Sequence, residues 1–454
     1  MKFINLIAFL VLVLVSSCGS KKVRVDDRPS WVKTRPLSDT DYVGIAKSSK
    51  VQTPYKYEQL AKKDALVDLS SEISVNISSS SILSSVETPQ GFAESYSSLI
   101  KSKSKNDIEG YELVSTYDTG TEYWCYYRLN KEKYKRLRNE KKKTAVSKSL
   151  DLYKRSRISR NEGRLKSAII SDIKAIEAVK DYWNEDIEVE IDEEDVLLGN
   201  ELMSNLNVLI DELTITPRSN KINVVRGKPI DKELTSFVLT NSKGVEQEDI
   251  PVLFLYSDGR ISKNKAISDS EGVVSYGFKK FSSKNNQVKL TCKVDLSRLI
   301  NEASSDYLLH KLLRKMMPPH GSIDISVRNP IIYINTEERV LGREYTENQV
   351  SRVLTNYLVK KGFKITDYKS EGDFEIRINA NTSKVAKNAD RVYTCELRVD
   401  VKMYAEDKMV YSTKVNGIYG RGSNYESASK NAYTKVGDDI EIKVGNQLYR
   451  YILD

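Results

Sequence analysis

Residues 57–73 have the sequence YEQLAKKDALVDLSSEI, and this stretch decides the fold expected for the first part of the chain. Apolar residues recur in it at every fourth position: Ala61, Ala65, Leu69 and Ile73. Lysines and acids fill most of the other positions, so the spacing predicts an amphipathic helix. Because two of the four apolar residues are alanines, the helix has a narrow face that can pack closely against a sheet.

Two alternating runs farther along the chain predict the sheet that this helix covers. The first run alternates Tyr111, Leu113, Ser115 and Tyr117, and the second alternates Tyr123, Cys125, Tyr127 and Leu129. The turn residues Asp118-Thr119-Gly120 lie between them, so the two runs predict a β-hairpin. With the helix, the hairpin makes an α+β domain at residues 31–131.

The order of these elements resembles the lipoprotein-20 family of bacterial envelope proteins. The resemblance is carried by Ser30-Trp31-Val32, by Asp41-Tyr42-Val43-Gly44-Ile45-Ala46, by the alanine-spaced helix and by Tyr123-Trp124-Cys125-Tyr126-Tyr127-Arg128-Leu129. It implies a small α+β fold in a membrane-associated lipoprotein, and some relatives are accessory parts of envelope machines such as the flagellar basal body. It implies no catalytic residue.

The first residues are typical of a secretory signal peptide. An apolar run from Phe3 to Val15 follows Met1-Lys2, and it is too short to span a bilayer comfortably. The run ends in Leu14-Val15-Ser16-Ser17-Cys18-Gly19, which resembles the lipobox of bacterial lipoproteins, where small residues precede a cysteine that is acylated before cleavage. We therefore expect residues 1–17 to be removed and Cys18 to carry lipid. The alternative is an amino-terminal anchor helix that happens to contain a cysteine.

The residues after Cys18 favour the outer membrane of a Gram-negative bacterium. Gly19-Ser20 differs from the acidic second position that resembles an inner-membrane retention signal. Basic residues from Lys21 to Arg24 occupy the stretch where an acidic cluster resembles a surface-export signal in some lineages. We expect a periplasm-facing protein held by a polar, basic tether at residues 18–30.

Composition narrows the classes of partner. The 454 residues allow about three domains, and 39% hydrophobic with 30% charged residues is typical of globular proteins. The net charge of +9 falls by one when Lys2 is removed, and it favours contact with anionic lipid or lipopolysaccharide headgroups. No nucleic-acid-binding signature is present, so nucleic acid is not expected as a partner. Beyond Cys18 the cysteines are Cys125, Cys292 and Cys395, an odd number that implies no disulfide framework, and buried thiols are expected at Cys125 and Cys395.

Residues 132–213 are expected to form a helical connector. Residues 131–180 contain 17 Lys or Arg and 6 acids, whereas residues 181–195 contain nine acids and no base, so the two blocks can pair. Two apolar runs around Asn161-Glu162-Gly163 predict a helical hairpin that resembles one tetratricopeptide unit. Since stacked arrays need several repeats, a connector or docking helix pair is favoured over a peptide groove.

The second half of the chain predicts two further domains. Short alternating runs at 214–299 favour a β-sandwich, and Pro251–Phe254, Asp258-Gly259 and Ser268–Val273 are similar to bacterial immunoglobulin-like domains of the invasin and intimin type, which act as spacers or adhesive surfaces. A linker follows at 300–321, with a Leu-rich helix at Tyr307–Met317 stopped by Pro318-Pro319, whose apolar face is expected to pack on protein.

An α/β domain is expected at 322–454. Its predicted elements are a strand at 323–327, a helix at 347–361, strands at 374–380, 395–403 and 409–415, a bend at 417–422, and a final helical element. Strict four-residue spacing from Ala428 to Leu448 drifts around a helix, so this element must wind or break, with Gly437 or Gly445 as the breaking point. The order of elements resembles the α/β domains of curli-secretion lipoproteins and the TolB amino-terminal domain.

No residue pattern predicts catalysis, a cofactor or a metal. His310 and His320 are the only histidines, both in the linker and expected at the surface, so no multi-histidine metal site can be built. The glycine-rich Gly417–Gly422 matches neither the dinucleotide fingerprint nor the P-loop, and a bend is favoured over a phosphate cradle. Asp192–Asp195 lacks the geometry of a calcium loop and is expected to be a solvated acidic strip that forms ion pairs with basic side chains.

The expected fold class is therefore multidomain α+β, and the expected function is non-catalytic. We expect an outer-membrane-anchored, periplasm-facing lipoprotein that binds or scaffolds an envelope complex for assembly, secretion or motility. Its partners would be the membrane, through lipid on Cys18, and envelope proteins, with homo-oligomers possible. The alternatives are an envelope enzyme or small-ligand receptor with a cleft between the last two domains, and a surface adhesin that acts through the β-sandwich.

Overall fold

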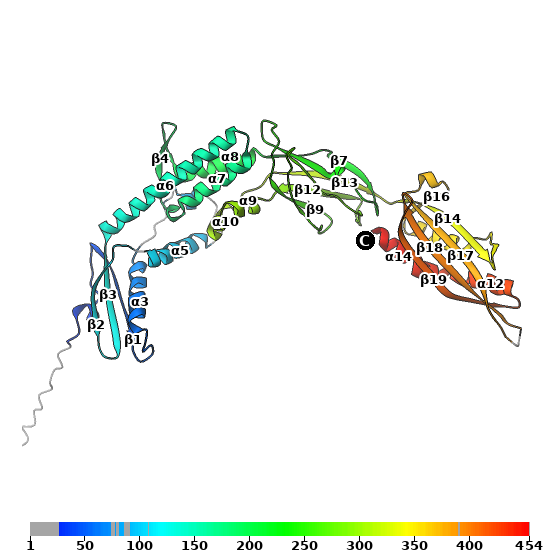
Figure 1. Ribbon diagram of the computed structural model, residues 1–454, viewed down its shortest axis with the longest axis horizontal. Coiled ribbons are helices and arrows are strands. Elements are labelled where there is room, and N and C mark those ends of the chain that lie inside the picture. The colour runs from blue at the N-terminus through cyan, green and yellow to red at the C-terminus, as the bar shows by residue number, and fades with distance from the viewer. Residues whose placement is uncertain are drawn as a thin grey trace, which may run out of the picture. The chain divides into compact units, whose positions relative to one another are not determined.

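The computed structural model describes residues 27–73, 78, 81–85, 91–107, 109–388 and 391–453. It has the expected multidomain α+β class, with helices and several sheets along the chain (Figure 1). The chain divides into two compact units. The first contains the chain up to Val146 together with Asp181–Glu185, and the second contains Ser147–Lys180 and the chain from Asp186 onward. The predicted signal peptide, Cys18 and most of the tether lie outside the described residues.

The first unit is built on a three-stranded antiparallel sheet with the order β1-β3-β2. Its strands are β1 (Asp41–Ser49), β2 (Glu112–Asp118) and β3 (Glu122–Asn130), and its helices are α2 (Ser30–Lys33), α3 (Tyr57–Ser71), α4 (Ile82–Ser85) and α5 (Phe92–Asp107). The predicted helix and hairpin are confirmed as α3, β2 and β3. Helix α5 was not predicted, and its Tyr96 ring stacks on Trp183 with centroids 6.1 Å apart.

Helix α3 packs on the sheet through its small-residue face. Ala61, Ala65 and Leu69 are fully buried together with Cys125 and Leu129 of β3. A β-carbon added to Gly44 of β1 would lie 2.2 Å from the carbonyl oxygen of Ala65 and 2.5 Å from the β-carbon of Leu69. Glycine is therefore required where the strand passes under the helix.

The second unit begins with helices. Helix α6 (Lys131–Asn161) contributes residues to both units, and it is followed by α7 (Leu165–Ala178), the hairpin β4 (Glu188–Ile191) and β5 (Glu194–Leu197), and α8 (Leu198–Asp211). The predicted helical hairpin is confirmed, because Ser149 and Ser156 of α6 donate hydrogen bonds to carbonyl groups of α7. Helix α8 packs on α7 as a third helix that the sequence pattern did not reveal.

Two sheets follow. The five-stranded sheet has the order β10-β9-β12-β13-β7 and the three-stranded sheet has the order β11-β8-β6. The strands are β6 (Thr214–Pro217), β7 (Lys221–Val225), β8 (Ser236–Thr240), β9 (Pro251–Tyr256), β10 (Lys265–Ile267), β11 (Val273–Ser275), β12 (Gln287–Val294) and β13 (His320–Arg328). Helices α9 (Leu296–Ala303) and α10 (Tyr307–Leu313) lie between β12 and β13, and the leucines of α10 at positions 308, 309, 312 and 313 are buried.

Strand β13 differs from the prediction that residues from 322 onward open the last domain. It pairs with β12 in antiparallel register and with β7 in parallel register, so it completes the five-stranded sheet. The boundary predicted at 321/322 therefore falls inside a strand. Alternation of Ile323, Ile325 and Val327 shows that a strand has one buried face, but it does not specify which strands are its neighbours.

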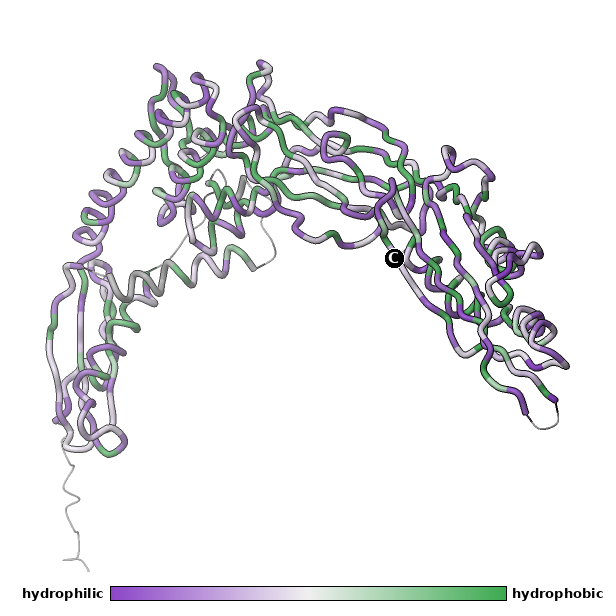
Figure 2. The backbone as a smooth tube through the Cα atoms, turned by 45° about the vertical axis from the view of Figure 1, so that its right-hand side comes forward, coloured by the Kyte–Doolittle hydropathy of each residue, from purple (hydrophilic) through white to green (hydrophobic). Residues whose placement is uncertain are grey.

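The last domain is a six-stranded sheet covered by helices on one face. Its strands are β14 (Ile331–Val340), β15 (Arg343–Glu344), β16 (Lys364–Thr366), β17 (Phe374–Lys387), β18 (Tyr393–Ala405) and β19 (Lys408–Gly422), with the main order β15-β14-β17-β18-β19 and β16 paired to β14. Hydrophilic and hydrophobic residues alternate along these strands (Figure 2), and the apolar ones, such as Ile376, Ile378 and Val401, are buried in the domain core.

The helices of this domain are α11 (Gln349–Lys360), α12 (Tyr425–Thr434), α13 (Val436–Ile440) and α14 (Asn446–Leu453), with a π-helical turn, η4 (Glu441–Gly445), between the last two. The predicted break in the final element is thus confirmed: the helix is interrupted before Gly437 and again at the π turn that ends at Gly445. The breaks let Ala432, Val436, Ile440, Val444 and Leu448 all reach the core.

The predicted bend at Gly417–Gly422 is wrong, because these residues belong to β19 and continue its pairing with β18. A β-carbon on Gly420 would lie 2.0 Å from the carbonyl oxygen of Ala428 and 2.3 Å from the backbone nitrogen of Ala432. The glycines thus allow helix α12 to approach the strand closely. Only Gly417, with a φ of +80°, has the turn-like backbone that the prediction assumed.

Candidate functional site

The residues that the sequence offered as candidates for lipidation, catalysis or metal binding do not form one site among the described residues. Cys18, the predicted lipidation site, lies outside the described residues. His310 is half-buried on α10 with its Nε2 atom 3.0 Å from the carbonyl oxygen of Ser304, and His320 is exposed on β13. Asp192 lies at the turn of the β4–β5 hairpin and forms an ion pair with Arg157, which agrees with the expected pairing of this acidic strip with basic side chains.

The three described cysteines, Cys125, Cys292 and Cys395, are all buried free thiols, which confirms the prediction for Cys125 and Cys395. Across the ranges that the structure describes, no group of three or more His, Cys, Asp or Glu side chains is placed to hold a metal ion. In the same part of the chain, no helix combines the length and the apolar character that crossing a membrane requires.

A polar hollow on the open face of the last domain is the candidate site. It has a volume of about 880 Å³, and every strand from β14 through β17 and β18 to β19 contributes to it. Its lining residues are Asn335, Glu337, Arg377, Ile378, Asn379, Asn381, Glu396, Arg398, Val399, Asp400, Lys402, Tyr404, Lys414 and Asn416. We call this surface the polar hollow. Its volume lies in the range of roughly 300–1,000 Å³ that is typical of ligand sites.

Strand register places the lining side chains in rows across the sheet. One row runs Glu337, Asn379, Asp400 and Lys414, and the next runs Asn335, Arg377 and Lys402. Neighbours within a row are direct cross-strand partners, with β-carbons about 5 Å apart. A row of four strands extends about 14 Å, because adjacent strands lie about 4.8 Å apart.

Ion pairs fix the charged side chains at the margin of the polar hollow. The guanidinium of Arg377 donates to both carboxylate oxygens of Glu375 at 2.8 and 2.9 Å, and it lies 4.2 Å from the ring centroid of Tyr404. Hydrogen bonds from Arg377 lower the pKa of Glu375 to about 2, so this carboxylate stays ionised at any physiological pH. Arg398 donates twice to Glu396, whose other oxygen accepts from the backbone of Gly417.

The middle of the polar hollow is different, because most of its side chains have no partner among the residues that the structure describes. Asn335, Asn379, Asn416 and Lys402 form no side-chain hydrogen bond with any residue that the structure describes. Asp400 Oδ1 is shielded from solvent without a hydrogen-bond partner in the described chain, and Asp400 Oδ2 lies 3.8 Å from Lys414 Nζ. Unused donors and acceptors are therefore grouped inside a frame of satisfied ion pairs.

Sequence reasoning missed this surface. Polar residues at every second position of β17 and β18 were visible, for example at Arg377, Asn379 and Asn381. The same alternation is produced by any antiparallel sheet that has one face in water. Only the pairing register shows that the unpaired residues are neighbours.

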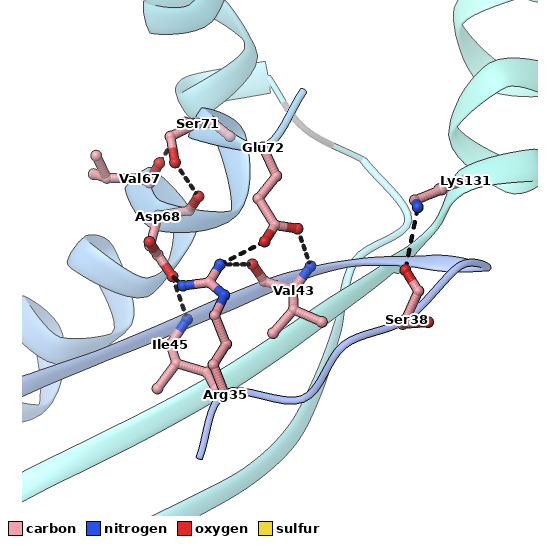
Figure 3. Close-up of polar contacts among 10 residues, drawn as sticks. Arg35, Ser38, Val43, Ile45, Val67, Asp68, Ser71, Glu72 and Lys131 are labelled. Carbon is pink, nitrogen blue, oxygen red and sulfur yellow. Dashed lines mark hydrogen bonds and ion pairs between the residues drawn. The ribbon is translucent and has the colours of Figure 1, made fainter. Parts of the chain in front are cut away.

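A second polar arrangement lies at the free edge of β1 in the first unit (Figure 3). Asp68 lies in helix α3, and Glu72 caps the carboxyl end of that helix. Glu72 accepts a hydrogen bond from the backbone N–H of Val43, and Asp68 accepts one from the backbone N–H of Ile45, each at 2.8 Å. Arg35 pairs with both carboxylates at 2.7 Å and donates to the carbonyl oxygen of Val43 at 2.6 Å. Side chains thus occupy the strand edge that another strand would otherwise use.

Comparison with known proteins gives no family. No family model matches the chain, and no curated protein matches it. The resemblances to the lipoprotein-20 family, to immunoglobulin-like domains and to the curli-secretion and TolB domains therefore stay predictions.

Three solved structures that are similar to part of the chain are bacterial lipoproteins. A minor lipoprotein from Acinetobacter baumannii is 12% identical with a TM-score of 0.20, and the match covers 26% of this chain and 92% of that one. A lipoprotein from Caulobacter crescentus CB15 is 9% identical with a TM-score of 0.19, covering 26% and 90%. The rare lipoprotein B from Shewanella oneidensis is 11% identical with a TM-score of 0.17, covering 26% and 91%. Likeness at this level defines neither the family nor the function of this chain.

Proposed function

We propose that the chain is a lipid-anchored protein of the outer membrane that faces the periplasm and acts by binding, as a non-catalytic component of an envelope complex. The observation that carries the proposal is the lipobox-like stretch Leu14–Gly19 directly after a signal-type apolar run. Folded sequence begins at helix α2 (Ser30–Lys33), so only a short segment separates Cys18 from the first unit. A segment of that length reaches at most about 40 Å when fully extended.

The electrostatics of the chain agree with this proposal. The excess of lysine and arginine favours the neighbourhood of anionic headgroups and adds to the anchoring that lipid on Cys18 would supply. Several folded domains follow the anchor in the chain, and we propose that they bind the protein partners.

Expression of the full chain and of a Cys18→Ala variant in a Gram-negative host tests the anchor. We expect the wild-type mature protein to start at Cys18, to carry lipid by mass spectrometry and to sediment with outer membranes, and the variant to lose lipid and the membrane association. An unmodified thiol at Cys18, or recovery of the wild-type chain from the cytosol, would overturn the proposal.

The orientation and the binding role need separate measurements. Protease added to intact cells is expected to leave the protein uncut, and protease added after permeabilisation of the outer membrane is expected to degrade it. Cleavage in intact cells would instead favour a surface adhesin. Affinity capture of the tagged, lipidated chain from solubilised envelopes is expected to recover a stoichiometric protein partner, and recovery of the chain alone would contradict the scaffold role.

A further inference from the structure

We propose that the polar hollow of the last domain is a binding site for a neutral glycan chain. The inference goes beyond the proposed function, since it assigns a ligand class to a surface of this chain and does not require the lipid on Cys18. It rests on the uncommitted side chains in the middle of the hollow, on their balance of charge and on the lack of apolar anchors.

The uncommitted side chains define the hydrogen bonding that a ligand must provide. The amides of Asn335, Asn379 and Asn416 each offer two donors and an acceptor, and the carboxylate of Asp400 offers acceptors only. A sugar hydroxyl both donates and accepts, so it can serve an amide and a carboxylate at neighbouring positions. The cross-strand pair Asn379–Asp400 presents the two kinds of group side by side.

The orphaned oxygen of Asp400 points to a donor that the protein does not supply. An acceptor atom that is shielded from water and has no hydrogen bond costs folding free energy. The cation paired with Asp400 is Lys414, an exposed side chain whose Nζ lies 3.8 Å from the other carboxylate oxygen. A ligand hydroxyl that displaces the lysine side chain can donate to Asp400 and remove this cost.

Charge balance disfavours a strongly ionic ligand. The lining contains four basic residues, Arg377, Arg398, Lys402 and Lys414, and three acidic ones, Glu337, Glu396 and Asp400. A polyanion or a polycation would meet like charges on neighbouring strands, which costs binding free energy. A neutral chain meets no such repulsion.

The composition also disfavours a protein as the occupant. Cores of protein–protein interfaces are rich in aromatic residues and Met and poor in Lys, Glu and Asp, and their binding energy comes from desolvated anchors. Tyr404 is the aromatic residue among the lining residues, and the guanidinium of Arg377 already lies over its ring. The surface is suited to a ligand that is itself polar along its whole length.

Direct binding tests the proposal on the full mature chain purified in detergent. The probes are hexameric oligosaccharides of N-acetylglucosamine and of glucose, both neutral, and an oligomer of galacturonic acid, which is anionic. Isothermal titration or ligand-observed NMR is expected to show binding of at least one neutral chain and at least tenfold weaker binding of the anionic one. The variants Asn379→Ala and Asp400→Ala are expected to weaken neutral-chain binding fivefold or more.

A matched control is available on the opposite side of the same domain. Lys360→Ala removes an exposed side chain of helix α11, away from the sheet face, and is expected to bind like the wild type. Circular dichroism and the melting temperature of each variant show whether the domain stays folded. The proposal is overturned if neither neutral chain binds, if the anionic chain binds best, if Lys360→Ala weakens binding as much as Asp400→Ala, or if the same residues are needed only for capture of a protein.

Discussion

The carbonyl oxygen of Ala428 in helix α12 lies 2.0 Å from the position that a β-carbon on Gly420 of β19 would occupy. Helix α12 therefore packs directly on the backbone of β19. Gly44 and Ala65 have the same relationship in the first unit, at 2.2 Å. In both domains a strand glycine meets a helix whose contacting residue is alanine. Two unrelated segments of the chain therefore use backbone-to-backbone packing to hold a helix on a sheet.

Replacing Gly420 with alanine is expected to destabilise the last domain by about 1–3 kcal/mol or more, because overpacking forces α12 away from the sheet and the contact involves backbone atoms that cannot rotate aside. Urea unfolding measures the change. Gly437→Ala is the matched control: a β-carbon there meets nothing within 4 Å, and the residue is helical. It is expected to be neutral or to stabilise by up to about 1 kcal/mol. Equal effects of the two variants would contradict the packing role of Gly420.

The buried Asp172 predicts a pH dependence of stability in the helical part. Burial raises its pKa to about 7, against a hydrogen bond from Asn205 that lowers it, and Oδ2 lacks a partner among the described residues. The folded state then binds the proton more tightly than the unfolded state. Stability is greatest below the unfolded pKa and falls as the pH rises from about 4 to about 7.

The variant Asp172→Asn replaces the titrating carboxyl with a neutral amide. It is expected to be about 2–4 kcal/mol more stable than the wild type at pH 8 but close to it at pH 4. Urea unfolding at the two pH values is the measurement. Asp211→Asn, at the exposed end of α8, is expected to keep the pH slope of the wild type. A wild-type slope that survives in Asp172→Asn would show that another group titrates.

Helix α11 receives its amino-terminal cap from a distant residue. Asn348 precedes the helix with a φ of +45° and makes no side-chain cap, and Glu338 of β14 instead accepts from the backbone N–H groups of Val350 and Ser351 at 3.1 and 2.9 Å. Glu338→Ala leaves the buried Val350 donor and the half-buried Ser351 donor without this partner and is expected to cost about 2–4 kcal/mol in thermal or urea unfolding. Glu337→Ala, on the exposed face of the same strand, is expected to change stability by less than about 0.5 kcal/mol. Comparable losses in the two variants would refute the capping role.

The carboxylates at the edge of β1 predict a solution property. Removing both with Asp68→Ala and Glu72→Ala exposes the N–H groups of Val43 and Ile45 to pairing with another strand. Under the same conditions, light scattering is expected to give a larger mass for the double variant than for the wild type. Asp64→Ala, an exposed acid on the same helix, serves as the control. An unchanged mass in the double variant would show that the edge is protected by something else.

Local patterns were sufficient to predict much of the fold. Four-residue spacing located α3, alternation located β2, β3, β17 and β18, and drift of the spacing from Ala428 onward predicted the broken final helix. What failed depended on neighbours far along the chain. The buried face of β13 was clear, but its pairing with β7, about a hundred residues earlier, was not.

The site was less accessible than the fold for the same physical reason. Glycines at 420 and 422 have the composition of a turn, and only the approach of α12 shows that they lie in a strand. Asn379 and Asp400 are ordinary solvent-facing residues in sequence, and only the register of β17 against β18 places the amide beside the carboxylate. Cys18 shows the opposite case, because its prediction depends on contiguous residues alone.

The pairing of β13 also has a mechanical consequence. Only Asn329 and Pro330 separate the end of β13 at Arg328 from the start of β14 at Ile331. A pull on the last domain therefore reaches β13 first, and this strand is hydrogen-bonded on both sides by β12 and β7. The bonds to β12 are perpendicular to the strand and those to β7 are slanted, so a load directed along β13 shears many of them together instead of opening them one at a time. A chain built in this way resists tension at the point where the sheet that holds β13 continues into the sheet that holds β14.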